Sequence, residues 1–124
     1  MFACFQVSVF RRGVETGVLI VLCSFPDEEK ARQIGAILVE KQAAACVNIV
    51  PGLRSIYRWE GRVCDEAEVL GIIKTTPGKY EDLERLILEL HPYDTPEVVS
   101  WTADRTAEAY ARWVAESVGT GPPA

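Results

Sequence analysis

The sequence is poor in several residue types, and each shortage narrows the range of functions. Its 124 residues include a single histidine, and acidic residues outnumber basic ones by 18 to 13. General acid–base catalysis most often uses histidine, and the chain has neither a Gly-rich phosphate loop after a strand nor a nucleophile elbow. Without a run of lysine and arginine it also has no basic stripe to follow a phosphate backbone. We therefore expect neither an enzyme nor a nucleic-acid-binding protein.

Closely spaced cysteines and long apolar runs are missing as well. The four cysteines are Cys4, Cys23, Cys46 and Cys64. Their wide spacing is typical neither of a disulfide scaffold nor of a structural zinc site, so we interpret them as free thiols in a reducing compartment. No stretch approaches the roughly 20 apolar residues of a membrane span. Arg11 and Arg12 follow an apolar stretch instead of preceding it, which is the wrong order for an export signal. We expect a cytoplasmic protein that does not contact a membrane.

The length and the apolar content predict one globular domain. A chain of this length buries roughly two thirds of its unfolded surface in a single core. Residues 1–16 form a leader whose sequence allows disorder, residues 17–119 carry all the periodic patterns, and residues 120–124 form a tail. The domain is therefore expected at 17–119.

Hydrophobic periodicity predicts four strands and three helices in this domain. Residues 18–23 and 69–73 are apolar on both parities, which is typical of strands buried on both faces. Apolar residues at helical spacing mark the helices. The expected elements are a strand at 18–23, a helix at 27–42, an extended segment at 45–59 that is interrupted at Pro51 and Gly52, an extended segment at 63–76, a helix at 80–90, a strand at 95–102 and a helix at 107–118.

This order predicts an α+β protein with a ferredoxin-like βαββαβ fold, an antiparallel sheet and an extra C-terminal helix. The second and third strands run for about 14 residues, well beyond the usual five or six, and a tight reversal at residues 60–62 joins them. We expect this long hairpin to project beyond its own domain. Helices on one face of the sheet cannot cover the apolar side chains of the other face, so a partner subunit is expected there.

Two residues are candidate metal ligands. Cys23 ends the first strand, where a thiolate would suit a soft ion such as copper. His91 follows the second helix, and Pro92 restrains its backbone. Each also has a structural interpretation, because buried free cysteines are common and a histidine at a helix end often satisfies backbone carbonyls.

Acidic and aromatic residues give further candidates. The carboxylates are Glu60, Glu68, Asp94 and Glu97, and the aromatic residues are Tyr57, Trp59, Tyr93 and Trp101. Only Glu68 and Glu97 interrupt otherwise apolar strands, and a salt bridge from Lys74 to either of them is at least as plausible as a functional site. The aromatic rings suit either a ligand-stacking platform or an anchor for a subunit interface.

Several motifs in one order resemble the CutA (divalent-cation tolerance) family over residues 17–119. They are Cys23 with Pro26-Asp27, the segment 44–52, the residues Ser55, Tyr57, Trp59, Glu60 and Gly61, then Glu68, Lys74-Thr75, the segment 91–97, and Tyr110 with Trp113. The resemblance implies a ferredoxin-like homotrimer, divalent-cation tolerance and copper binding. It also implies Cys23 and His91 as metal ligands. Leu90 stands where some relatives have a further histidine, so a complete site needs Glu97 or a neighbouring subunit as a third donor.

One alternative function belongs to another class. PII-like signalling or scaffold proteins share the trimeric ferredoxin-like plan and would hold a small molecule or a protein partner in the cleft between subunits. This likeness is an analogy at the level of the fold. On either interpretation the protein is not an enzyme and needs no obligatory cofactor.

Overall fold

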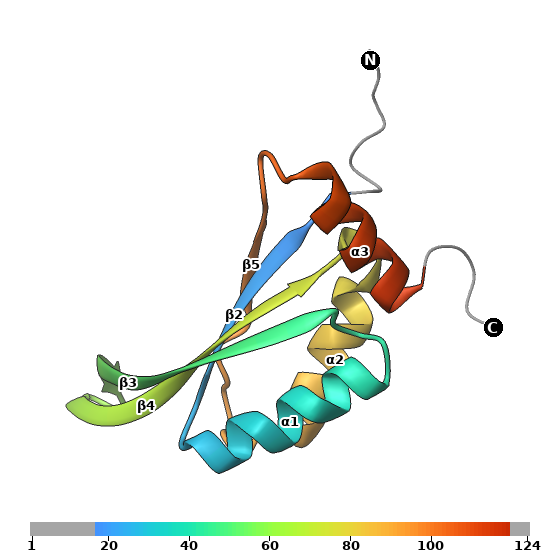
Figure 1. The fold of residues 1–124 in the computed structure, drawn as a ribbon. Coiled ribbons are helices and arrows are strands. Elements are labelled where there is room, and N and C mark those ends of the chain that lie inside the picture. The colour runs from blue at the N-terminus through green and yellow to red at the C-terminus, as the bar shows by residue number, and fades with distance from the viewer. Residues whose placement is uncertain (1–16, 120–124) are drawn as a thin grey trace.

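The structure, a computed structural model, describes residues 17–119 (Figure 1). The expectations for the leader at 1–16 and the tail at 120–124 lie outside the described residues. The elements in chain order are β2 (Leu19–Phe25), α1 (Glu28–Glu40), β3 (Cys46–Trp59), β4 (Arg62–Thr75), the 3-10 turn η2 (Pro77–Lys79), α2 (Tyr80–Leu90), β5 (Val99–Thr102) and α3 (Glu108–Val118).

The four strands form one antiparallel sheet in the order β3-β4-β2-β5. The two central strands, β4 and β2, are the ones whose sequences are apolar on both parities. This topology confirms the predicted ferredoxin-like α+β fold with its additional C-terminal helix. Because β3 and β5 are the edge strands, each has one side without a hydrogen-bonded neighbour among the described residues.

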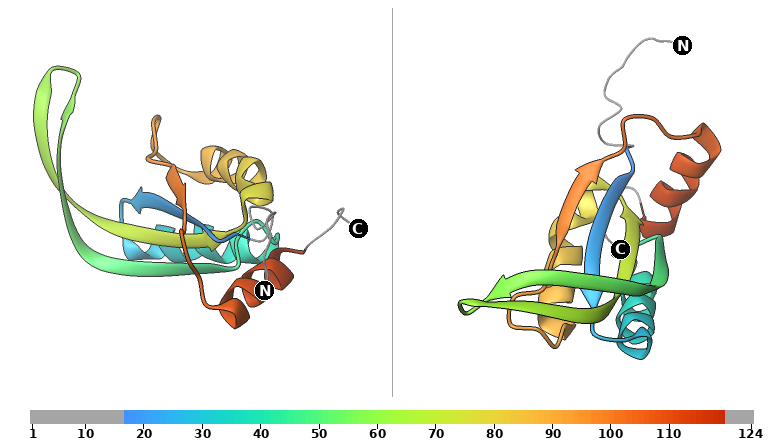
Figure 2. Two further views of the ribbon diagram at one scale, coloured as in Figure 1. Left: turned by 90° about the horizontal axis from the view of Figure 1, so that it is seen from above. Right: turned by 90° about the vertical axis from the view of Figure 1, so that its left-hand side faces the viewer.

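Alternation along β2 separates the two faces of the sheet. Val21, Cys23 and Phe25 are fully buried in the core beneath α1 and α2, whereas Ile20, Leu22 and Ser24 point to the opposite face. Helices α1 and α2 both lie on the core side (Figures 1 and 2). A smaller cluster of Val18, Ala45, Val114 and Val118 packs α3 against the end of the sheet.

The hairpin β3–β4 has the predicted length, with 14 residues in each strand. At its tip Glu60 and Gly61 both have positive φ angles of 51° and 77°, which is the backbone geometry of a tight two-residue hairpin turn. A bulge lies between Val50 and Leu53, where the sequence predicted an interruption, and Gly52 supplies a φ of 84° there. The distal half of the hairpin projects beyond the helices and curls round to one side (Figure 2).

Three predicted details differ from the structure. The last strand spans only Val99–Thr102 instead of 95–102, because only residues 99–102 pair with β2 and Pro96 has no N–H to donate to a ladder. Helix α1 is shorter at both ends than the predicted 27–42, because Asp27 is its N-cap and accepts a hydrogen bond from the Lys30 N–H at 2.7 Å. Helix α3 begins at Glu108 instead of the predicted 107, because Ala107 is its N-cap.

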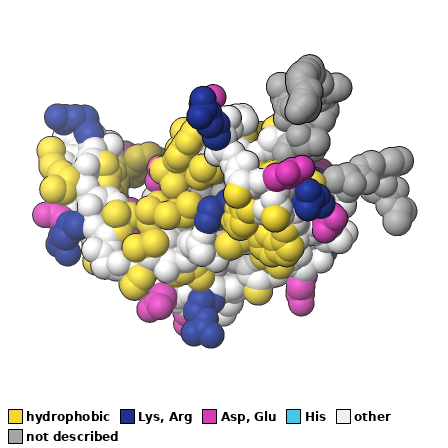
Figure 3. Space-filling view, turned by 45° about the horizontal axis from the view of Figure 1, so that its top comes forward, with side chains coloured by type: hydrophobic (Ala, Val, Ile, Leu, Met, Phe, Trp, Pro, Cys, Tyr) yellow, Lys and Arg dark blue, Asp and Glu magenta, His cyan; other side chains and the backbone are white. Residues whose placement is uncertain are grey.

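The face of the sheet opposite the helices carries exposed apolar side chains. They are Val50, Tyr57, Trp59, Val99 and Trp101, and Ile56 and Val63 near the hairpin tip are exposed as well. Hydrophobic side chains extend from the hairpin across the middle of the molecule (Figure 3). No helix within residues 17–119 is long and apolar enough to cross a membrane.

Candidate functional site

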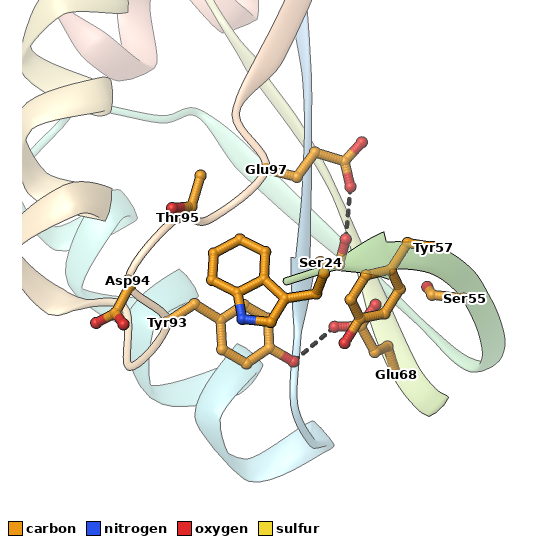
Figure 4. Close-up of a pocket in the computed structure, with 9 residues that line it drawn as sticks. Ser24, Ser55, Tyr57, Glu68, Tyr93, Asp94, Thr95 and Glu97 are labelled. Atoms are coloured by element: carbon orange, nitrogen blue, oxygen red, sulfur yellow. Dashed lines mark hydrogen bonds between the residues drawn. The ribbon is translucent and has the colours of Figure 1, made fainter. Parts of the chain in front are cut away.

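A pocket of about 480 Å³ opens between the curled hairpin and the loop that follows α2. Nine residues line it: Ser24, Ser55, Tyr57, Trp59, Glu68, Tyr93, Asp94, Thr95 and Glu97. Figure 4 shows them with the loop residues on one side and Tyr57, Ser55 and Glu68 on the other. The volume lies within the range of pockets that hold small molecules.

Strand parity places the hairpin residues in this pocket. Ser55, Tyr57 and Trp59 alternate along β3, so their side chains leave the same face of the strand. Glu68 is on β4 opposite Leu53, which has the same parity as these three residues. Ser24 reaches the pocket because its side chain points away from the core side of β2. The pocket therefore assembles from segments up to 73 residues apart in the chain.

Two short hydrogen bonds organise the polar side of the pocket. The Tyr93 hydroxyl donates to Glu68 Oε2 at 2.5 Å, and the Ser24 hydroxyl donates to Glu97 Oε1 at 2.5 Å (Figure 4). Burial, followed by this hydrogen bond to Glu68, raises the pKa of Tyr93, so the phenol stays protonated and remains a donor.

The pocket has a negative electrostatic character. Glu68 is only 8% exposed, yet within residues 17–119 neither Glu68 nor Glu97 forms a salt bridge with a lysine or arginine. Asp94 adds a third carboxylate to the lining, and no lysine or arginine lines the pocket. A ligand that carries positive charge would therefore meet favourable electrostatics here.

The structure brings the three predicted metal ligands close to one residue, Ser24. Cys23 precedes Ser24 on β2, and Glu97 accepts its hydroxyl hydrogen bond. His91 Nε2 lies 2.7 Å from the carbonyl oxygen of Ser24. The ligand prediction therefore identified residues that share a neighbourhood, although they come from a strand, a helix end and a loop.

Two of these three residues do not offer free donor atoms. Because a carbonyl only accepts, His91 Nε2 donates to it, and His91 Nδ1 accepts from the Tyr93 N–H at 3.2 Å. The Cys23 thiol is fully buried, and burial, with Glu97 and Glu68 adding to it, raises its pKa to about 12. Metal ligation needs a neutral ring nitrogen with a free lone pair and a deprotonated thiol.

As they lie, Cys23, His91 and Glu97 therefore do not fit a copper ion. In residues 17–119 no three His, Cys, Asp or Glu side chains are grouped so that they could hold a metal. Only Glu97, which is exposed and has one carboxylate oxygen outside the Ser24 hydrogen bond, offers a donor without rearrangement. The carbonyl that His91 contacts is on β2 and not at the helix end, where the structural interpretation of this histidine expected it.

The remaining candidates divide between the pocket and other sites. Glu60 lies at the hairpin turn and Trp101 on the edge strand β5, both outside the pocket. The salt bridge suggested for Lys74 is not formed: its Nζ donates to Asn48 Oδ1. Lys74 is six residues from Glu68 along β4, which is about 20 Å in an extended strand.

Sequence reasoning missed three lining residues, Ser24, Ser55 and Thr95. Of these three, Ser24 was the easiest to identify from the sequence, because it is a polar residue next to Cys23 at the end of an apolar strand. Its position, one residue after a core residue, places it on the opposite face.

Comparison with known proteins identifies the same family that the sequence motifs resemble. The profile of one family, described as CutA1 divalent ion tolerance protein, matches residues 19–117. The divalent-cation tolerance protein CutA of Thermus thermophilus is 45% identical over 100 residues, which cover 81% of this chain and 97% of that protein. A chloroplastic CutA of Arabidopsis thaliana is 36% identical over 80% of this chain, which spans 54% of the length of that relative.

Solved structures agree with the sequence comparison. The structure of the Thermus thermophilus divalent cation tolerance protein matches with a TM-score of 0.80 and 44% identity, covering 82% of this chain and 99% of that one. A protein from Archaeoglobus fulgidus, described as a periplasmic divalent cation tolerance protein CutA, matches with a TM-score of 0.80 and 30% identity over 82% of this chain and 99% of its own.

Proposed function

Because the chain belongs to the CutA1 divalent ion tolerance family, we propose that it acts in divalent-cation tolerance as a non-enzymatic homotrimer that binds the cation beside Ser24. The observation that carries this proposal is the pair of pocket carboxylates Glu68 and Glu97, which have no lysine or arginine partner within residues 17–119. Carboxylate oxygens are ligands for most divalent ions.

The open sheet face supports the homotrimer. Tyr57 and Trp59 are partly exposed on this face of the hairpin, and Trp101 is half-exposed on the edge strand β5. Ile56 and Val63 are exposed on the other face of the projecting hairpin. Exposed apolar surface of this kind, next to two edge strands, is typical of a subunit interface. A neighbouring subunit on this face would lie close to the pocket and could add donor atoms to the cation.

Among the three predicted ligands beside Ser24, Glu97 is the one that can bind a cation without rearrangement. It is exposed, and Ser24 fixes one of its oxygens while the other stays free. Copper binding by Cys23, His91 and Glu97 together stays a prediction, since it requires His91 to release the Tyr93 N–H and Cys23 to lose its proton.

The PII-like alternative is not favoured, because the Thermus thermophilus relative and its solved structure are named for divalent-cation tolerance. A cytoplasmic location remains part of the proposal. It rests on the free thiols of Cys23, Cys46 and Cys64, which are typical of a reducing compartment. Fractionation of the native host would test it against the periplasmic location named for the Archaeoglobus fulgidus relative.

Two measurements on one sample test the proposed function. Size-exclusion light scattering should give three times the chain mass of 13.7 kDa. Calorimetric titration of chelator-treated protein with Cu(II), Zn(II) and Mg(II) should show saturable binding of at least one of these ions, lost in Glu97→Gln and kept in Glu40→Gln. Glu40 is an exposed acid on α1 outside the pocket. A monomer, or binding that survives in Glu97→Gln, would contradict the proposal.

A further inference from the structure

The same pocket combines aromatic rings with negative charge. Tyr57, Trp59 and Tyr93 line it together with Glu68, Asp94 and Glu97. Tyr57 comes from the hairpin and Tyr93 from the loop after α2, so these two rings stand on opposite sides of the opening (Figure 4). Trp59 of the hairpin adds a third ring to the lining. Aromatic faces and carboxylates both attract cations, but the faces prefer organic ones whose methylene groups also contact the ring.

Glu68 gives this pocket an unsatisfied charge. Its side chain is more than nine-tenths buried and takes one hydrogen bond, from the Tyr93 hydroxyl to Oε2. No hydrogen bond or salt bridge within residues 17–119 reaches Oε1. A buried carboxylate with an unpaired oxygen costs free energy that a donor from a ligand would recover.

The shape and the donor set select among ligand classes. An anion would be repelled by three carboxylates. A bare metal ion would use only the acids and leave the rings and most of the 480 Å³ without contacts. A primary ammonium group supplies three N–H donors for Glu68, Glu97 and the hydroxyls of the lining, and an aliphatic stem would lie against the rings.

We propose that this pocket binds a primary ammonium group on a short aliphatic chain. Glu68 and Glu97 accept its hydrogen bonds, and Tyr57, Trp59 and Tyr93 contact the stem. The ammonium group can belong to a free amine or to a lysine side chain of another protein. The proposal does not depend on the metal-binding function, because it needs no metal ion, although both ligands would use the carboxylates of Glu68 and Glu97.

Tryptophan indole signals provide the test. The chain has three tryptophans, Trp59 in the pocket, Trp101 on β5 and Trp113 on α3. In ¹H–¹⁵N spectra of the full chain, n-butylammonium chloride should shift the Trp59 indole signal in a saturable way and leave the other two in place. Nα-acetyl-lysine methylamide should act similarly, and a stronger effect than that of butylammonium would identify a protein side chain as the source.

Matched ligands and variants decide the outcome. n-Butanol, and sodium chloride at the same ionic strength, should not shift the Trp59 signal. Glu68→Gln should weaken butylammonium binding by about tenfold, because it removes one charged hydrogen bond worth about 1.5 kcal/mol. The control Glu40→Gln should leave butylammonium binding unchanged. Because Trp59 is 45% exposed, Trp59→Leu should keep the fold. Saturation transfer from the protein to butylammonium should be lost in Trp59→Leu but not in Trp113→Leu. Equal shifts with n-butanol or sodium chloride, or no shift at all with butylammonium, would overturn the proposal.

Discussion

The hydrogen bond between Tyr93 and Glu68 gives a quantitative test of the pocket. The phenol is the one donor within residues 17–119 that reaches this carboxylate, at 2.5 Å, and Glu68 is only 8% exposed. Tyr93→Phe removes the hydroxyl and keeps the ring. A hydrogen bond to a charged group is worth about 1.5–3 kcal/mol, so the free energy of unfolding should fall by about 2 kcal/mol per chain.

The chain also contains a control for this substitution. Tyr80 donates to Glu84 Oε2 at 3.2 Å within α2, where both partners are only partly buried. Tyr80→Phe removes the same atom from a longer and more solvated hydrogen bond, so it should cost less than about 1 kcal/mol.

The assay is urea unfolding followed by circular dichroism, at one protein concentration because an oligomer's stability depends on concentration. With an m-value of about 2 kcal/mol per M, the midpoint should drop by about 1 M in Tyr93→Phe. A double-mutant cycle with Glu68→Gln should give a coupling of about 1–2 kcal/mol. A coupling near zero, or equal losses in Tyr93→Phe and Tyr80→Phe, would refute the assignment of this bond.

Three further predictions concern the core and α1. Gly71→Ala should lower the free energy of unfolding by about 1–3 kcal/mol, because the new Cβ would lie 2.7 Å from Cε2 of the buried Phe25; Gly78→Ala, with nothing within 4 Å, should be near neutral in the same urea titration. The Cys23 pKa is raised from 9.0 to about 12, so the unfolded chain loses this proton at a lower pH than the folded one. The free energy of unfolding should therefore fall more between pH 9 and 12 in the wild type than in Cys23→Ala; parallel plots of that free energy against pH would contradict this. Asp27→Ala removes the N-cap of α1 and should cost about 1 kcal/mol in thermal unfolding, with Asp27→Asn retaining most of the stability.

The sequence predicted the fold well where periodicity and turn chemistry act locally. The apolar parities of β2 and β4, the bulge after Val50 and the reversal at Glu60 and Gly61 all follow from neighbouring residues, and the structure confirms them. The last strand was predicted too long because a sequence with high β-propensity does not reveal which of its residues pair with the neighbouring strand.

The site was less predictable because its contacts are long-range. Glu68 was recognisable as an acid in an apolar strand, but its partner Tyr93 is 25 residues away. The curl of the hairpin that carries Tyr57 into the pocket has no sequence signal (Figure 4). The hydrogen bond of His91 Nε2 depends on a carbonyl 67 residues away, whereas Nδ1 accepts from the Tyr93 N–H two residues along the chain. A residue list that resembles a metal site therefore does not reveal whether its donor atoms are free.

Anomalous diffraction from crystals soaked in a divalent copper or zinc salt would test the central claim most directly, since it locates the ion and its ligands together. The account predicts an ion in the pocket beside Ser24, with Glu97 at a bonding distance of about 2.0–2.2 Å and His91 still hydrogen-bonded to Ser24 and Tyr93. An ion held by Cys23 and His91 after rearrangement, or no ion within the pocket, would contradict it.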